Sequence, residues 1–170
     1  FVCMFARKWS SGRIAERSTS EEHHLELARI YGRATTAYFF NNRALHLTYS
    51  TLRATEHAER WGPSAEMARS NAELGGVVGF AGLEKTARHF EARAQETADS
   101  VGDLSAVGYV HMVNALYLVG IGDWEQTRAS LDRCQDVCGR LGDHVTWSNA
   151  QAIRFWLHHY QGDVDRKEAI

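Results

Sequence analysis

A spacing of 40 residues between helix-ending residues constrains the fold of this 170-residue chain more than any other feature. One series consists of Gly62, Gly102 and Gly142, and a second consists of Asn42, Gly82, Gly122 and Gly162. Glycine and asparagine commonly end helices because they adopt the left-handed backbone conformation. Two interleaved series with one period predict a helix pair that repeats about every 40 residues, which is typical of an α-solenoid.

The stretch 122–142, GDWEQTRASLDRCQDVCGRLG, shows one helix of this pattern most clearly. Asp123 is suited to cap the N-terminus, and Gln126 stands three residues later, as in a capping box. Gly142 stands where a left-handed residue ends a helix, and basic Arg140 falls in the last turn. The stretch is therefore predicted to be a complete amphipathic helix.

The same start and stop signals predict an all-α chain. The expected helices cover about 21–40, 43–61, 65–81, 83–101, 104–120, 122–142 and 144–161, with an eighth starting near 163. A single proline, Pro63, and many helix-forming residues agree with this prediction. We interpret residues 1–19 as a linker or the end of a preceding helix, and 20–170 as one helical repeat domain. Because the sequence begins with Phe1 and ends within a helical pattern, we expect it to be a fragment of a longer protein.

Alignment of the units at a 40-residue offset gives columns of similar residues. The small columns are Ala54, Ala94 and Cys134; Ala58, Ala98 and Cys138; and Ala28, Ala68, Gly108 and Ser148. A large apolar column consists of Leu27, Met67, Val107 and Trp147. Small residues let helices approach closely, and large ones fill the layer between repeats. Further positions expected to be buried in the first two helices are Leu25, Ile30, Tyr31, Ala34, Tyr38, Phe39, Leu45, Leu47, Tyr49, Leu52 and Trp61.

Three glycines, Gly75, Gly76 and Gly79, fall inside one expected helix, where each is unfavourable by about 1 kcal/mol relative to alanine. A phosphate-binding loop is a poor explanation, because no strand precedes the cluster and no Lys-Ser/Thr pair follows it. We interpret the cluster as a place of close helix approach or a kink.

Composition and charge exclude several function classes. The net charge of −2 gives no electrostatic footprint for nucleic acid. Three cysteines are too few for a disulfide framework, which favours a reducing, cytoplasmic location. No uninterrupted apolar run reaches about 18 residues, so no membrane association is expected.

The candidate metal and catalytic residues have simpler explanations. Cys134 and Cys138 are four residues apart on one helix face, but both occupy columns otherwise filled by alanine, so we interpret them as small core residues. The pairs His23-His24 and His158-His159 lack metal-site spacing, and no HExxH or GxSxG motif is present. The sequence therefore predicts no metal, no cofactor and no catalytic activity.

The second helix of each pair resembles a tetratricopeptide repeat. The segment 122–134 has a Gly-Asp turn followed by an aromatic residue, with small residues at Thr127 and Cys134. The segment 82–94 places Ala87 and Ala94 at the same positions. The period exceeds the usual 34 residues, so the resemblance is to a longer, tetratricopeptide-like variant.

The run at 38–75 resembles the helical C-terminal region of large bacterial signalling proteins. Its markers are YF-x-N, beginning at Tyr38, and the segment AERWGPSAEMAR at 58–69. Proteins of that kind carry a class III adenylate/guanylate cyclase domain and an ATPase module before the helical repeats. The resemblance covers about 20–170 and implies a regulatory region in signal transduction. The cyclase and ATPase motifs themselves are absent, so no catalytic residue is carried over.

Three function classes follow. The first is a non-catalytic interaction scaffold that binds a protein or peptide segment, or neighbouring domains of the same chain. The second is a small-molecule sensor with a pocket on the inner helices, which a deep apolar pocket would favour. The third is an enzyme, which a cluster of buried ionisable groups in a cleft would favour.

The resemblance also suggests where a partner would bind, because the first helix of each tetratricopeptide-like pair lines the concave side. The column Arg29, Arg69, Tyr109 and Asn149 places hydrogen-bonding groups on those helices. We predict that it binds an acidic or carboxylate-bearing segment, flanked by Thr36, Trp156 and Tyr160. The alternative is a solvated helix face that binds nothing.

Overall fold

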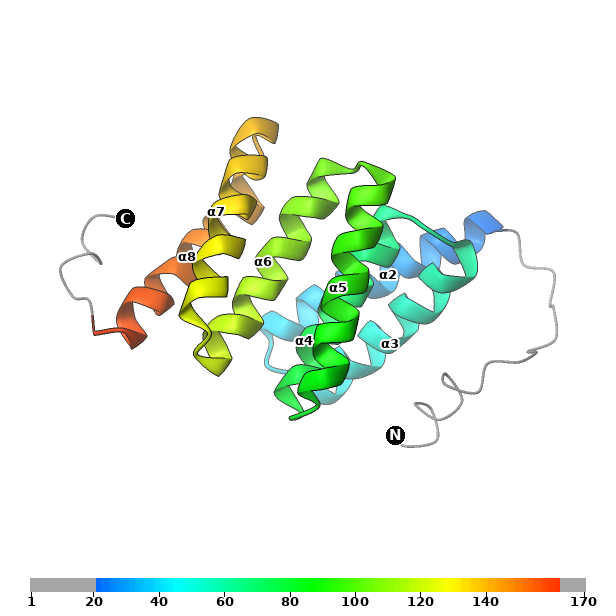
Figure 1. Cartoon of the computed structure of the whole chain (residues 1–170). Coiled ribbons are helices and arrows are strands. Elements are labelled where there is room, and N and C mark those ends of the chain that lie inside the picture. Colours follow the sequence, from blue (N-terminus) through cyan, green and yellow to red (C-terminus); the bar gives the residue numbers. More distant parts are fainter. Residues whose placement is uncertain (1–20, 163–170) are drawn as a thin grey trace.

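A computed structural model describes residues 21–162 and shows seven α-helices stacked in chain order (Figure 1). The helices are α2 (Glu21–Phe40), α3 (Ala44–Trp61), α4 (Ala65–Phe80), α5 (Glu84–Val101), α6 (Leu104–Ile121), α7 (Trp124–Leu141) and α8 (His144–Tyr160). No strand occurs within this range. The all-α prediction is confirmed, and each helix boundary falls within two residues of the expected position. The interpretations of 1–19 and of a helix after 163 concern residues outside the described part.

The turns confirm the periodicity that the sequence suggested. All seven residues of the two series have positive φ, and Asn42 (φ 54°) is the one non-glycine with positive φ among the described residues. Gly122 and Gly142 end α6 and α7 in the left-handed conformation, as their positions predicted. The chain therefore reverses direction at equal intervals, which pairs each helix with the next.

Side-chain caps begin four of these helices. Ser64 accepts a hydrogen bond from the backbone N–H of Met67 (3.2 Å), and Asp103, Asp123 and Asp143 act in the same way for α6, α7 and α8. The full capping box predicted at Asp123 is not formed. The backbone N–H of Asp123 donates to Leu118 O (3.0 Å) in the preceding turn, so Gln126 bonds the Asp123 carboxylate instead (2.8 Å).

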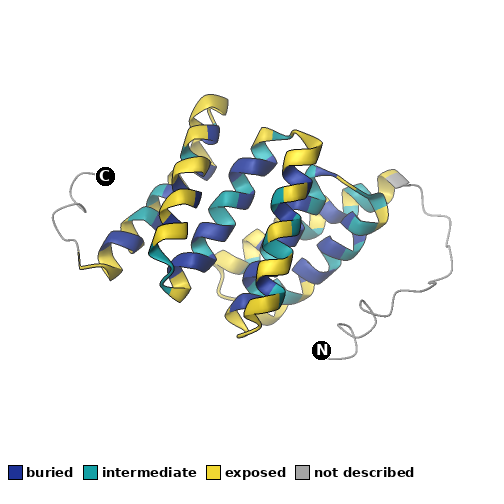
Figure 2. Ribbon diagram, in the orientation of Figure 1, coloured by how far each residue is buried: buried dark blue, intermediate teal, exposed yellow. Residues whose placement is uncertain are grey.

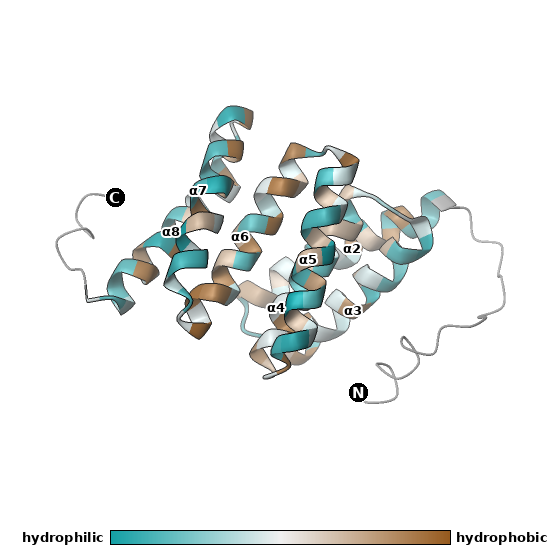
Figure 3. Cartoon of the chain, viewed as in Figure 1, coloured by the Kyte–Doolittle hydropathy of each residue, from teal (hydrophilic) through white to brown (hydrophobic). Residues whose placement is uncertain are grey.

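The first helices of the pairs pack on one another. Contacts run from α2 to α4, from α4 to α6 and from α6 to α8, whereas α3, α5 and α7 contact only helices of that first set. In Figure 2, α5 and α7 carry exposed residues along one side and buried residues along the other. Figure 3 shows hydrophilic residues along the same two helices. The arrangement is that of a helical repeat.

Small residues occupy the tight contacts between paired helices. Ala54, Ala94 and Cys134 are buried, as are all members of the second small column. Gly108 illustrates the need for a small residue, because a Cβ added there would lie 2.7 Å from Cys138 Sγ. At Gly79, an added Cβ would lie 2.3 Å from the Tyr117 ring. The glycine cluster of α4 therefore includes a point of close helix approach, and α4 continues through it unbroken.

Several positions expected to be buried are exposed. In the first pair these are Ile30, Phe39, Leu45 and Tyr49, and in α8 they are Ser148 and Trp147. The reason is the same at both ends. Within the described residues, α2 and α3 have no repeat before them, and α8 contacts only α6 and α7. The neighbouring helices of the described part therefore cover only a portion of the apolar residues on these helices.

Helix α6 is enclosed by four other helices. These helices are α4, α5, α7 and α8. By length and composition its 18 residues also pass as a candidate membrane span, contrary to the expectation that no segment would do so. Half of the helix is buried against its neighbours, as expected for a core helix.

The small columns can be tested by the same substitution at two sites of α5. Ala94 is fully buried, whereas Ala92 is exposed. We expect Ala94→Leu to overpack the contact with α4 and α6 and to lower the free energy of unfolding by about 1–3 kcal/mol. Ala92→Leu should change it by less than about 0.5 kcal/mol. Urea denaturation measures both values, and equal effects would contradict the helix facing described above.

Candidate functional site

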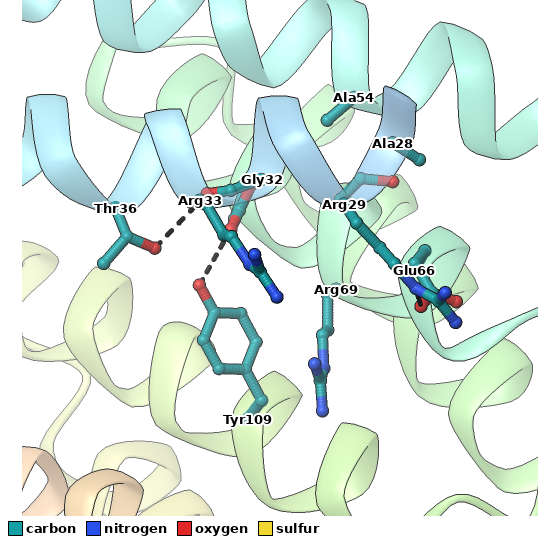
Figure 4. Close-up of a pocket in the computed structure, with 11 residues that line it drawn as sticks. Ala28, Arg29, Gly32, Arg33, Thr36, Ala54, Glu66, Arg69 and Tyr109 are labelled. Carbon is teal, nitrogen blue, oxygen red and sulfur yellow. Dashed lines mark hydrogen bonds and ion pairs between the residues drawn. The ribbon is translucent and has the colours of Figure 1, made fainter. Parts of the chain in front are cut away.

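A pocket lies between the first helices of three successive pairs. It has a volume of about 260 Å³. Its lining residues are Ala28, Arg29, Gly32, Arg33 and Thr36 from α2, Ala54 from α3, Glu66, Arg69, Ser70 and Glu73 from α4, and Tyr109 from α6. Figure 4 shows α2 along one side of the pocket, with the Tyr109 hydroxyl directed toward it from α6.

Four of the seven predicted binding residues meet in this pocket: Arg29, Thr36, Arg69 and Tyr109. They come together because α4 contacts both α2 and α6, which brings equivalent positions of three repeats side by side. Asn149, Trp156 and Tyr160 lie on α8, which contacts neither α2 nor α4, and they do not line the pocket. Asn149 is half-buried, and the two aromatic side chains are exposed.

The predicted binding residues that line the pocket already have partners within the protein. Arg29 forms ion pairs with Glu26 (2.6 Å) and Glu66 (2.7 Å). Arg69 donates to Ser105 Oγ (2.8 Å), and its guanidinium carbon lies 5.6 Å from the centre of the Tyr109 ring. Thr36 donates to Gly32 O (3.3 Å). Arg29 and Arg69 are thus held by partners within the protein, although Nε of Arg69 is buried without a hydrogen-bond partner.

Sequence reasoning did not identify Arg33 and Glu73 as residues of the pocket. They stand 40 residues apart, one helical turn after Arg29 and Arg69, so the same alignment contains them. The Arg33 side chain is exposed and makes no hydrogen bond or ion pair among the described residues. It extends into the space between α2 and α6, beside Arg69 (Figure 4). Arg33 is therefore the cation of the pocket that is available to a ligand.

Glu73 is the most perturbed carboxyl group of the pocket. Tyr109 donates its hydroxyl hydrogen to Glu73 Oε1 (2.7 Å). The other oxygen, Oε2, is buried and has no hydrogen-bond partner in the described protein. Burial raises the pKa of Glu73 to about 7, although the Tyr109 hydrogen bond and the Arg69 charge act in the opposite direction. Burial also raises the pKa of Tyr109 well above its usual value, so the phenol remains protonated.

The cysteine and histidine candidates lie elsewhere. Cys134 and Cys138 are buried with their sulfurs 3.9 Å apart, and burial raises the pKa of both thiols. His24 Nδ1 lies 2.9 Å from His57 Nδ1. Within the described residues, no three His, Cys, Asp or Glu side chains are grouped closely enough to hold a metal ion.

Comparison with known proteins gives no assignment for this site. No protein-family model matches the chain, and no curated protein matches it significantly.

The pKa of Glu73 predicts a dependence of stability on pH. Because this pKa is higher in the folded than in the unfolded chain, the folded state binds more protons and stability falls as pH rises from about 4.5 to about 7. A glutamine in place of Glu73 would retain an acceptor for Tyr109 without the charge. The Glu73→Gln variant should therefore match the parent at about pH 4 and exceed its free energy of unfolding by up to roughly 3 kcal/mol at pH 8. Denaturation curves at both pH values measure this difference, and a difference that does not vary with pH would contradict the account.

Proposed function

We propose that this chain is a non-catalytic interaction scaffold: a tetratricopeptide-like superhelix whose inner helices α2, α4 and α6 bind an acidic segment of a protein partner or of a neighbouring domain. The observation that carries the proposal is the pocket, which Arg29, Arg33 and Arg69 line and in which Arg33 has no hydrogen bond or ion pair among the described residues. Guanidinium groups bind carboxylates through paired hydrogen bonds. Two carboxyl groups, Glu66 and Glu73, also line the pocket, and the raised pKa of Glu73 reduces its negative charge near neutral pH.

The size of the pocket favours a side chain as the occupant. Pockets for drug-sized ligands usually measure about 300–1,000 Å³. The volume here is about 260 Å³, and five of the eleven lining residues are Arg or Glu. Such a space suits the carboxylate of an aspartate or glutamate. The small-molecule sensor remains the second candidate only for a small anion.

The same helix face continues from the pocket to an apolar region. Positions 7 and 11 residues after the column fall on the same face, because 7 and 11 residues are close to two and three helical turns. The position 11 residues on is occupied by Phe40 in α2, Phe80 in α4 and Tyr160 in α8, all exposed. Aromatic side chains of this kind anchor protein segments. This continuation supports a peptide partner over a free anion.

An enzyme is a weaker proposal, although a carboxyl group with a raised pKa in a cleft is a feature of active sites. Glu73 Oε1 is bound to a phenol that remains protonated, and the Ser70 hydroxyl donates to Met67 O (3.2 Å) rather than to a base. Neither histidine nor cysteine lines the pocket. The residues present suit binding better than acid–base or nucleophilic catalysis.

We further propose that the scaffold belongs to a larger cytoplasmic signalling protein of bacterial type. The support is the resemblance of 38–75 to the helical region that follows cyclase and ATPase modules. The open reading frame upstream of Phe1 tests this context directly. Cyclase and ATPase motifs there would support it, and an unrelated domain would overturn it.

Selection from a random displayed peptide library on the immobilised chain tests the binding proposal. We expect enrichment of peptides that contain aspartate or glutamate. Arg33→Ala should weaken binding of a selected peptide about tenfold, the equivalent of one charged hydrogen bond, while stability changes by less than about 0.5 kcal/mol.

Arg43→Ala provides the matched control, because Arg43 is an exposed arginine outside the pocket. It should leave the peptide affinity, measured by fluorescence polarisation, within about twofold of the parent value. Selected peptides without acidic residues, or equal losses for Arg33→Ala and Arg43→Ala, would contradict the proposal.

A further inference from the structure

Glu73 lines the pocket, and its two carboxylate oxygens differ in their hydrogen bonding. Oε1 accepts the hydrogen bond from Tyr109, so this oxygen is occupied. Oε2 is buried without a partner in the described protein. A buried carboxylate oxygen without a donor is unfavourable, and protonation of the carboxyl group removes its charge.

We propose that the pocket takes up a proton together with the carboxylate of its ligand, and that Glu73 is the residue that binds this proton. This inference rests on the proposed function and adds the regulation of the same site. A proton from solvent forms an O–H bond at Glu73 Oε2 and neutralises this carboxyl group beside the carboxylate of the ligand. Negative charge therefore enters the pocket without two ionised carboxylates having to face each other.

The surroundings of Glu73 support this assignment. Helix α2 contributes Arg29 and Arg33, α6 contributes Tyr109, and α4 itself contributes Arg69 and Glu66. Helix α3 adds only Ala54 to the lining, and α5 adds none of the lining residues.

Glu73 is placed to titrate near neutrality. Its pKa is raised to about 7, whereas that of Tyr109 lies well above 10. No histidine lines the pocket. A dependence of binding on pH between 6 and 8 would therefore report on Glu73.

The test is calorimetric titration of the chain with the peptide acetyl-Gly-Ser-Glu-Ser-Gly-amide at pH 6, 7 and 8. If binding requires the protonated acid, the dissociation constant should rise about tenfold from pH 6 to pH 8. Titrations at pH 7 in buffers of different ionisation enthalpy should show uptake of about half a proton per peptide. The corresponding Gln peptide should bind more weakly and without proton uptake.

Two variants make the same change of charge in the same pocket. In Glu73→Gln the affinity should equal that of the parent at pH 6 and stay within about twofold up to pH 8. Glu66→Gln also removes one carboxylate, and it should keep the dependence on pH because Glu73 remains.

The outcomes separate the inference from the proposed function. Binding of the Glu peptide that is equal at pH 6 and pH 8, or a pH dependence that persists in Glu73→Gln, would overturn the proton-linked inference and leave the acidic-segment scaffold standing. Absence of binding at pH 6, where the pocket is most cationic, would overturn both.

Discussion

Close approach of paired helices through small side chains is the constraint on which the rest of the structure depends. Ala94 and Cys134 are fully buried, and Gly108 leaves room for the sulfur of Cys138. A larger residue at such a position would force the helices apart, since protein interiors contain little spare volume. Because these contacts recur every 40 residues, the first helices of the pairs lie side by side, and residues of separate repeats can form one pocket.

The chemistry of the pocket depends on this packing of the first helices side by side. Glu73 on α4 meets Tyr109 from α6, while Arg33 approaches from α2. On an isolated helix the Glu73 carboxyl group would be solvated and have an ordinary pKa. Enclosed between two neighbouring helices, it loses solvent and its pKa rises to about 7. Three arginines nevertheless keep the pocket attractive to an anion, and this combination of charge and desolvation underlies the proposed binding of an acidic segment.

Local signals carried most of the information about the helices. Gly122-Asp123 specifies both the end of α6 and the cap of α7 through short-range geometry, so the sequence alone could place this turn. The burial of residues at the ends of the stack was less predictable. Ile30 and Tyr49 have the apolar character of core residues, but their exposure depends on which helices cover the first pair. A repeat alignment assigns equivalent positions and does not identify the neighbours at an end.

The candidate site was also predictable only in part, because the repeat alignment assigns equivalent positions but not their surroundings. The column alignment identified Arg29, Arg69 and Tyr109, which do meet in one pocket. It did not identify Glu73, because a glutamate on a helix normally indicates a solvated face, and its burial arises only from the packing of α2 and α6 against α4. The partners that engage Arg29 and Arg69 are likewise set by tertiary packing.

The central claim is that the face of α2, α4 and α6 that lines the pocket is the binding surface. Amide chemical-shift mapping of the ¹⁵N-labelled chain, titrated with acetyl-Gly-Ser-Glu-Ser-Gly-amide at pH 6, tests it most directly. The account predicts saturable shift changes concentrated around Arg33, Arg69 and Tyr109. Shift changes concentrated instead on α3, α5 and α7, the second helices of the pairs, would contradict this claim. Shift changes that do not saturate would contradict it as well.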